Sequence, residues 1–378
     1  MKHWAQNRFK ALTSACVLSM MATAGWSQSL TWLGTLGGNI SSAHDVSADG
    51  SVVVGIAQDS NGFYRPFRWT PRDGMQDLGT LGGRHGAAMR VSPNGATIVG
   101  TASTVNSSNF ADIDSVGFLF LSVNHSSHPF RWTQGSGMQD LGTFGGCCGW
   151  ANSVSADGGV VVGWAYNARE EGRAFRWENN RMRDLGTLDG ARSVALDVSA
   201  DGGVVVGWAQ NDSGQRRAFR WENDQMRDLG TLGGAESVAR GVSADGGVVV
   251  GWAQNASGQW RAFRWTENGI EDLSQTYANL LSGGSYFIAA HEVSEDGRYI
   301  VGYGYNAARG RNEGFLLDTW RVGDTNGDGC VDDADLLAVL FAFGSAGTGD
   351  TRHEDINKDG IVDDADLLQV LFNFGSGC

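Results

Sequence analysis

The sequence has little proline, an excess of acid over base, and no long apolar run after its first residues. Only 4 of its 378 residues are proline although 56 are glycine, which excludes a disordered linker rich in both. The formal net charge is −14. Because such a surface repels nucleic acid and anionic lipid, we expect neither as a partner. No stretch beyond the N-terminal segment is long and apolar enough to span a bilayer, so no membrane insertion is expected.

Residues 1–24 have the pattern of a secretory signal peptide. Lys2, Arg8 and Lys10 are positively charged, an apolar run follows at 11–21, and Ala22 and Ala24 fit a small-residue cleavage site. The sequence therefore predicts a secreted, extracellular protein, with attachment to a cell surface as one form of that location.

Four cysteines remain after removal of the signal peptide, namely Cys147, Cys148, Cys330 and Cys378. An even number in an exported protein permits three disulfide pairings. We favour a bond between Cys330 and Cys378 because it ties the two ends of the C-terminal segment. Free or vicinal thiols remain the alternative.

A repeat of 44 residues in its most regular copies accounts for most of the chain. Each copy divides at Gly, Asp, Asn and Ser into four short apolar runs, which indicates strands joined by hairpins. The first glycine of the LGTLGG-type block falls at Gly34, Gly79, Gly142, Gly186 and Gly230, and Ser274 takes this place in a sixth copy. Four strands in such a period are typical of one propeller blade. The sequence therefore predicts an all-β domain over residues 29–320, a six-bladed β-propeller.

Paired aromatic residues identify the expected core. Phe and Trp recur two positions apart, so both side chains point to one face of their strand. The pairs are Phe67/Trp69, Phe130/Trp132, Phe175/Trp177, Phe219/Trp221 and Phe263/Trp265. We expect packing between neighbouring blades to bury them.

Charged positions near these aromatics indicate how the ring closes. We expect an arginine and an aspartate of each copy to lie across a hairpin from each other. The residues are Arg68, Arg131, Arg176, Arg220 and Arg264 with Asp77, Asp140, Asp184, Asp228 and Asp272. In the terminal copies apolar residues, Leu316 and Trp32, replace both charges. Residues 30–36 are therefore expected to form the outermost strand of the last blade, so that the N-terminal strand closes the propeller.

The LGTLGG and VSADG blocks occur together with triplets that read HPF at 128–130 and RAF at 217–219 and 261–263. In these blocks the chain resembles the HAF-type extracellular repeats of bacterial secreted proteins, over residues 30–320. That resemblance implies export and repetition, and it brings no established reaction.

The loops after LGTLGG and VVVGW are expected at one end of the propeller, where binding loops gather on a rigid scaffold. Asn167, Asn211, Asn255 and Asn306 recur there, and one loop carries an insertion at 103–124. We expect a glycan or a protein as the ligand of this face. No histidine or nucleophile pattern indicates catalysis, so we expect no enzyme activity from the repeats.

Residues 324–378 contain two copies of a calcium-loop pattern, DTNGDGCVDDAD at 324–335 and DINKDGIVDDAD at 355–366. Hard oxygen ligands at this spacing select Ca²⁺, so two ions are expected as cofactors. The candidate ligands are Asp324, Asn326, Asp328, Cys330, Asp332 and Asp335, then Asp355, Asn357, Asp359, Ile361, Asp363 and Asp366. Cys330 and Ile361 would contribute backbone carbonyls.

A helix with an apolar stripe is expected after each loop and none before it, which predicts a small all-α domain of two half EF-hands. One stripe is expected to hold Leu336, Val339, Leu340 and Phe343, with Leu367, Val370, Leu371 and Phe374 as its repeat. Two such units with Asp at position twelve resemble a type I dockerin. The resemblance implies calcium-dependent folding and docking onto a cohesin-like surface or scaffold protein. The partner-binding positions it implies are Asp333, Ala334, Leu337 and Phe341, with Asp364, Ala365, Leu368 and Phe372. Positions ten and eleven read Asp-Ala here, where typical dockerins carry Ser/Thr-type pairs.

These features together predict a secreted calcium-binding protein. Its non-catalytic propeller would bind a glycan or a protein, and its dockerin-like module would attach it to an extracellular complex. The alternative is a polysaccharide-active hydrolase or lyase displayed by the same module. A third possibility is a propeller that serves as a spacer and binds nothing.

Overall fold

The computed structural model describes residues 31–48, 50–104, 127–327, 329–346, 353–357 and 359–378. The expected signal peptide, nearly all of the 103–124 insertion and the candidate ligand Asp328 lie outside these residues. The chain divides into a unit of residues 1–34 and a second unit, Thr35–Cys378. Residues 31–34 of the first have no regular secondary structure. Across the described ranges, no helix is long and apolar enough to cross a membrane.

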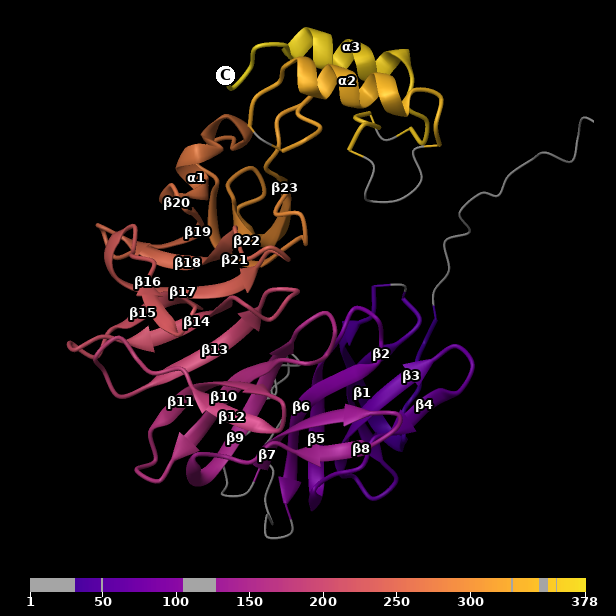
Figure 1. Ribbon diagram of the computed structural model, residues 1–378, viewed down its shortest axis with the longest axis vertical. Helices are drawn as coiled ribbons and strands as arrows, with labels where there is room; N and C mark the ends of the chain where they lie inside the picture. The colour runs from indigo at the N-terminus through magenta and orange to yellow at the C-terminus, as the bar shows by residue number, and fades with distance from the viewer. Residues whose placement is uncertain (1–30, 49, 105–126, 328, 347–352, 358) are drawn as a thin grey trace, which may run out of the picture. The chain divides into compact units, whose positions relative to one another are not determined.

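Six antiparallel sheets follow one another along the second unit (Figure 1). Sheet 1 contains β1 (Gly37–Val46), β2 (Val53–Asp59), β3 (Tyr64–Thr70) and β4 (Gly74–Asp77). Sheet 2 contains β5 (Gly82–Val91), β6 (Thr97–Thr104), β7 (Ser127–Thr133) and β8 (Gly137–Asp140). Sheet 3 contains β9 (Gly145–Val154), β10 (Val161–Asn167), β11 (Gly172–Glu178) and β12 (Arg181–Asp184).

Sheet 4 contains β13 (Ser193–Val198), β14 (Val205–Gln210), β15 (Arg216–Glu222) and β16 (Gln225–Asp228). Sheet 5 contains β17 (Gly233–Val242), β18 (Val249–Asn255), β19 (Trp260–Thr266) and β20 (Gly269–Asp272). Sheet 6 contains β21 (Tyr286–Val293), β22 (Tyr299–Asn306) and β23 (Arg311–Asp318). Within each sheet every strand pairs with its neighbour in sequence. The expectation of an all-β region made of short hairpin-linked strands is therefore confirmed.

The VSADG turns explain why these hairpins form and how successive sheets connect. In sheet 4, Ser199 accepts a hydrogen bond from the Val204 amide and donates one to Asp201. Neighbouring turns are bonded through their backbones, because Ala156 N–H donates to Ala200 O at 3.0 Å and Ala200 N–H donates to Ala244 O at 3.0 Å. The repeated turn residues thus serve both the hairpin and the junction between sheets.

The glycine of the VVVGW block is required by close backbone packing. A Cβ on Gly163 would lie 1.9 Å from Trp150 O on the paired strand, and one on Gly207 would lie 2.0 Å from Val194 O. No side chain fits at that distance. The glycine therefore permits the first two strands of each sheet to pair closely.

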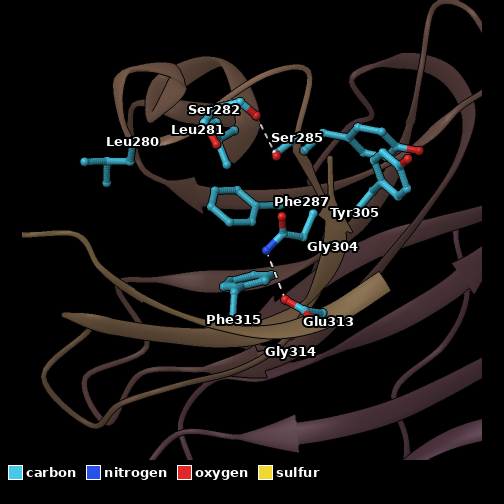
Figure 2. Close-up of a pocket in the computed structure, with 12 residues that line it drawn as sticks. Leu280, Leu281, Ser282, Ser285, Phe287, Gly304, Tyr305, Glu313, Gly314 and Phe315 are labelled. Atoms are coloured by element: carbon cyan, nitrogen blue, oxygen red, sulfur yellow. Dashed lines mark hydrogen bonds between the residues drawn. The ribbon is translucent and has the colours of Figure 1, made fainter. Parts of the chain in front are cut away.

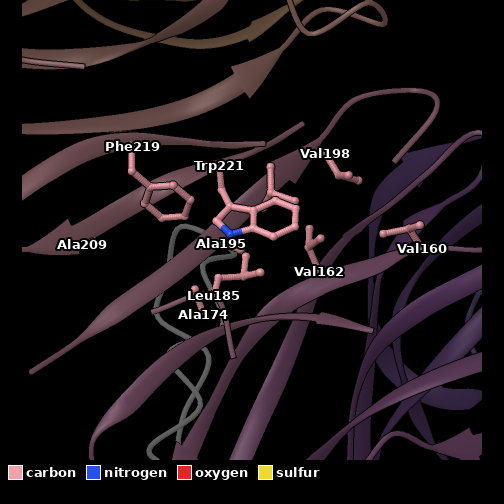
Figure 3. Packing of buried hydrophobic residues seen from close by; sticks show 10 residues of the cluster. Val160, Val162, Ala174, Leu185, Ala195, Val198, Ala209, Phe219 and Trp221 are labelled. Atoms are coloured by element: carbon pink, nitrogen blue, oxygen red, sulfur yellow. The ribbon is translucent and has the colours of Figure 1, made fainter. Parts of the chain in front are cut away.

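Five apolar clusters lie between consecutive sheets. The cluster between sheets 3 and 4 includes Val162, Ala195, Phe219 and Trp221, as Figure 3 shows. Equivalent clusters join sheets 1 and 2, 2 and 3, 4 and 5, and 5 and 6. All five Phe residues of the Phe/Trp pairs are fully buried, and the expected aromatic core is confirmed for them.

The arginine–aspartate pairing expected across each hairpin is wrong. Four of the five aspartates instead pair with the residue three positions before the expected arginine, as in Arg217–Asp228 at 3.2 Å and Arg173–Asp184 at 3.1 Å. The fifth, Asp272, accepts a hydrogen bond from the Ser274 amide at the start of α1 (Leu273–Thr276). The strand register explains this, since Asp228 lies opposite Phe219. The arginine expected to pair with it, Arg220, donates to the Gly246 carbonyl in the VSADG turn of the next sheet at 3.2 Å.

Residues 30–36 are the segment expected to close the propeller, and the structure describes 31–36 of them. Residues 31–35 form no strand, and among the described residues β23 pairs with β22 alone. Two faces are consequently left uncovered. Val46 on sheet 1 is 52% exposed, whereas the same position in the other five sheets is 6–8% exposed. Val301 on sheet 6 is 39% exposed, and its five counterparts are fully buried.

The C-terminal segment contains two loop–helix units, with α2 (Asp333–Ala342) and α3 (Asp364–Asn373) packed against each other. Val331, Val339, Val362 and Val370 form its fully buried core. Of the expected apolar stripe, Leu340 and Phe343 are about half exposed and so are not core residues. Leu371 and Phe374 in the second unit are equally exposed. The favoured disulfide joins Cys330 and Cys378, and Cys147 is bonded to Cys148.

Candidate functional site

A cluster of charged side chains, which we call the central cluster, is built at one position of the repeat. This position is the penultimate residue of the first strand in every sheet. Its occupants are Asp45, Arg90, Ser153, Asp197, Gly241 and Glu292. A β-bulge interrupts the strand register beside it in all six sheets. A bulge re-aims the side chain next to it, and bulges are frequent beside functional sites.

Ion pairs connect this position between sheets, and one of them joins two sheets that are not consecutive in the chain. Arg90 of sheet 2 lies 3.1 Å from Glu292 of sheet 6 and 3.8 Å from Asp45 of sheet 1. Asp197 is buried and accepts hydrogen bonds from Ser153 Oγ at 2.7 Å and from the Val242 amide at 3.0 Å. Residues of sheets 1, 2 and 6 thus form one ion-paired group and residues of sheets 3, 4 and 5 form a hydrogen-bonded one, and the charges of the two groups influence each other.

Burial and like charge perturb the carboxyl groups of the central cluster. Burial, followed by the charge of Asp197, raises the pKa of Glu292 to about 7, although Arg90 opposes the shift. Burial likewise raises the pKa of Asp197. The three carboxylates Glu292, Asp197 and Asp45 raise the pKa of Arg90 against the effect of its burial. Burial and the nearby charge of Arg90 lower the pKa of Arg240. Such perturbed groups mark a candidate functional site.

Sequence reasoning missed this cluster although a signal was present. The residue before each Val-Ser of the turn block reads Asp, Arg, Ser, Asp, Gly and Glu through the six copies. The Val-Ser that follows is constant, but the residue before the cluster position also varies from copy to copy, so the variation at the cluster position resembles neutral drift. The position can be recognised as a site only from the structure, where a bulge lies beside it in each sheet and residues of different sheets contact one another.

Glu292→Gln is expected to flatten the pH dependence of stability. Because the folded-state pKa of Glu292 is about 7, above its ordinary 4.5, its contribution to stability is complete below pH 4.5 and is lost as the pH rises through 7. Glutamine cannot ionise, so the free energy of unfolding of the variant relative to wild type should rise between pH 5 and pH 8. Because Glu292 keeps 39% of its side-chain surface exposed, solvent screens part of the effect.

Urea unfolding at both pH values measures this difference. Glu267→Gln is the matched control, since Glu267 makes an exposed ion pair with Arg227 at 3.1 Å away from the cluster. A parallel pH dependence in Glu292→Gln and Glu267→Gln would refute the assignment.

The predicted calcium loops bring their first and twelfth residues into buried positions. Asp335 is fully buried and accepts hydrogen bonds from the Thr325 amide at 2.7 Å and the Asp332 amide at 2.9 Å. Its counterpart Asp366 is also fully buried and is held by equivalent backbone donors. Asp324 and Asp355 at position one are nearly buried. The buried twelfth residues of the two loops are therefore held by equivalent backbone donors.

The remaining candidate ligands have mixed placements. Asp332 and Asp363 cap helices α2 and α3, accepting from the Ala334 and Ala365 amides at 2.8 Å. Asn357 donates to Asp359 at 3.0 Å within the second loop. Asn326, Cys330 and Ile361 lie in the loops as expected. Within the part of the chain that the structure describes, no three His, Cys, Asp or Glu side chains are already arranged as a metal site.

The residues implied as partner-binding lie on exposed parts of α2 and α3. Phe341 is 87% exposed and its counterpart Phe372 is 82% exposed. Leu337 and Leu368 are each about half exposed. The four remaining positions, Asp333, Ala334, Asp364 and Ala365, are exposed at the first turn of each helix. The two units thus present two copies of the same apolar surface.

The asparagines expected on the binding loops have structural roles. Asn211 accepts hydrogen bonds from the Ser213 and Gln215 amides at 3.1 and 2.9 Å, which shapes its own turn. Asn167 and Asn255 do the same in their copies. Their recurrence is therefore explained by the hairpin loop.

Comparison with known proteins gives weak matches. No protein-family model and no curated protein matches the chain. The putative TolB of Agrobacterium tumefaciens matches at 14% identity and a TM-score of 0.42, over 62% of this chain and 80% of that one. The Pyrococcus horikoshii acylaminoacyl peptidase matches at 11% identity and 0.46, over 74% and 44%. Galerina marginata prolyl oligopeptidase B matches at 10% and 0.45, over 74% and 42%. This chain thus spans less than half of either peptidase. Matches this weak establish neither family nor function.

Proposed function

We propose that this chain is a secreted, non-catalytic binding protein whose C-terminal module holds two calcium ions and docks onto a cohesin-like partner. The observation that carries the proposal is the pair of matching loop–helix units, each with buried acidic residues on its inside and an exposed phenylalanine on its outside. The six sheets would form the binding domain, a propeller, with a glycan or a protein as its ligand.

Calcium is supported by the chemistry of the buried carboxylates. A buried carboxylate without a counter-ion costs several kcal/mol. Neither Asp335 nor Asp366 takes part in any ion pair among the described residues. Asp335 accepts hydrogen bonds from backbone amides and from the Thr325 hydroxyl, and Asp366 accepts them from backbone amides, so all of these donors are uncharged. Asp324 and Asp355 add oxygen donors at the first position of each loop. A divalent cation of the size of Ca²⁺ would balance this charge and coordinate these oxygens.

Docking is supported by the duplicated surface around Phe341 and Phe372. Exposed aromatic side chains surrounded by other apolar groups are typical anchors of protein interfaces. Because the two surfaces are equivalent, one partner would occupy either of them but not both. We therefore propose a single binding event that can use two orientations.

Phe341→Ala and Phe372→Ala are each expected to leave partner affinity within about threefold, and the double variant to lose at least about a hundredfold. A single substitution leaves the other surface intact, whereas the double removes both anchors. Titration calorimetry with a panel of recombinant cohesin modules in calcium measures this. Helix content at 222 nm verifies that each variant is folded. Loss of binding in one single variant alone would contradict two equivalent orientations, and binding to none of the panel would contradict docking.

We further propose that the six sheets close into a ring through residues 30–36. The Arg90–Glu292 pair supports closure, because it joins sheets 2 and 6 although 202 residues separate them. The exposure of Val46 and Val301 also supports closure. The counterparts of Val46 are buried in the five sheets that have a preceding sheet, and the counterparts of Val301 are buried in the five sheets that have a following one. The N-terminal segment with Trp32 would supply the fourth strand that sheet 6 lacks.

The central cluster favours a second candidate function, a polysaccharide hydrolase or lyase displayed by the same module. Two carboxyl groups of raised pKa, Glu292 and Asp197, are the kind of pair that glycosidases use. A polysaccharide-cleavage panel run beside a glycan array separates the two functions. Turnover that is lost in Glu292→Gln would favour the enzyme, and binding without turnover would favour the first proposal.

A further inference from the structure

Sheet 6 contains a cavity that the change in the sixth repeat creates. Ser274 replaces the repeated glycine, and helix α1 (Leu273–Thr276) with the short helix η1 (Ala278–Leu280) is inserted before β21. The cavity has a volume of about 180 Å³ and lies between residues 280–287 and strands β22 and β23 (Figure 2). It belongs to a copy that departs from the repeat through this inserted helical segment, and a specific ligand site on a repeated scaffold is expected where one copy differs from the others.

Aromatic rings form two walls of this cavity. Phe287 and Phe315 lie 4.3 Å apart between ring centroids, and Tyr286 and Tyr305 lie 5.6 Å apart. Arg261 of sheet 5 lies over the ring of Tyr286 at 4.3 Å and fixes its orientation. In Figure 2, Phe287 lies above Phe315, with Tyr305 to one side of both. The walls therefore offer flat apolar surface with phenol groups beside it.

Polar groups stand beside the rings. Asn306 donates to Glu313 at 3.0 Å, and Arg311 donates to the same carboxylate at 2.7 Å. The hydrogen bond from Arg311 is the largest influence that lowers the pKa of Glu313, so this group is ionised at neutral pH. Ser282 and Ser285 add hydroxyl groups to the lining. The cavity thus combines flat apolar walls with a charged acceptor, an amide and hydroxyls.

These properties restrict the chemistry of the ligand. An anionic ligand would be repelled by Glu313, and a cationic one would compete with the arginines that already neutralise it. The volume is below the roughly 300–1,000 Å³ of sites for drug-sized ligands, so a single ring fits better than an extended molecule. A neutral pyranose has an apolar ring face for the aromatics and hydroxyl groups for the carboxylate and the amide.

We propose that this cavity binds one neutral sugar ring, at the end or along the chain of an extracellular glycan. The inference rests on the proposed glycan-binding function and assigns it to sheet 6. Tyr305 would stack on the sugar, and Glu313 would accept hydrogen bonds from its hydroxyls.

The chain contains a matched control for this site. Tyr166 occupies the position of Tyr305 in sheet 3, where both tyrosines directly precede the loop asparagine in the second strand of their sheet. Tyr166 packs against Trp164 at 5.2 Å and lines no part of this cavity. Removing either ring therefore has a similar effect on its hairpin, and only one removal affects the sugar.

Calorimetric titration of the full chain in calcium, with cellohexaose, xylohexaose, mannohexaose and chitohexaose as neutral probes and hexagalacturonate as the anionic one, tests the site. For the neutral probe that binds, we expect Tyr305→Ala to weaken affinity at least about tenfold and Tyr166→Ala less than about twofold. Glu313→Gln keeps the shape of the cavity and is expected to weaken binding at least about threefold.

Equal affinity in Tyr305→Ala and Tyr166→Ala, with neutral binding intact, would overturn this site and leave glycan binding by the chain standing. Binding of hexagalacturonate alone would overturn the assignment of a neutral sugar. Binding of none of the probes by the wild-type chain would count against the glycan-binding function itself.

Discussion

Removal of calcium is expected to unfold residues 324–378 while the six sheets remain folded. Asp335 and Asp366 are fully buried carboxylates, and the module's core consists of four valines. Such a small core cannot offset buried like charges. At calcium a hundredfold above the dissociation constant, each site contributes about 2.7 kcal/mol, which chelation removes. Because α2 and α3 are the longest described helices, EDTA should abolish most of the helical circular dichroism at 222 nm.

Asp335→Asn should reproduce this loss at calcium concentrations that support the wild type. The amide keeps the shape of the side chain but removes the charge that calcium requires. Asp333→Asn is the matched control, because Asp333 lies in the same helical turn and is exposed. If the helical signal persists in EDTA, or if both variants behave alike, these loops are not calcium sites.

Val46→Asp is expected to destabilise the six sheets by on the order of 3 kcal/mol, about as much as Val91→Asp. Val91 is 6% exposed between sheets 1 and 2, so a carboxylate at this position would lose almost all of its hydration. Val46 occupies the same position at the edge of sheet 1. If the ring closes in solution, sheet 6 covers Val46, and the two substitutions should lower the free energy of unfolding by similar amounts. The free energy of unfolding of both variants, measured with urea, decides this.

Six sheets that do not close into a ring would give a different result. Val46→Asp would then cost less than about 1 kcal/mol, because the side chain would remain half in water. Trp32→Ala is a second measurement of the same closure: it should lower stability only if the N-terminal segment pairs with β23. A small effect of both substitutions would refute the closed ring.

The repeat could be predicted from sequence because its signals are local. Turn glycines and alternating apolar residues locate the strands, and the two-residue spacing of Phe219 and Trp221 identifies the buried face. The register across a hairpin is less local. Asp228 pairs with Arg217, which lies three residues before Arg220, the partner expected from the sequence. The exposure of Leu340 could not be predicted either, since helical periodicity does not say how many faces of a helix a neighbour covers.

The candidate sites likewise differ in whether their residues are continuous in sequence. The calcium loops are continuous in sequence, so all their positions could be named in advance. The central cluster joins residues such as Arg90 and Glu292 from distant copies, and its unlike residues carry no local pattern. The cavity of sheet 6 depends on where an inserted helix packs, which no spacing in the sequence encodes. Contacts that join non-repeated residues of different copies, unlike the repeated aromatic core, were beyond prediction.

The VSADG turns of sheets 4 and 5 are equivalent in the row of turn contacts, because each donates to the next turn through one alanine amide and accepts from the turn before it. After a unit such as the fourth is copied or lost, both new neighbours find the partner groups they had before. The turn of sheet 2 is different. The Pro93 carbonyl accepts a hydrogen bond from the Ala48 amide, but proline has no N–H to donate to the next turn. The turn contacts alone would therefore accept a second copy of the fourth repeat but not of the second, whereas the central cluster and the proposed closed ring restrict the number of repeats to six.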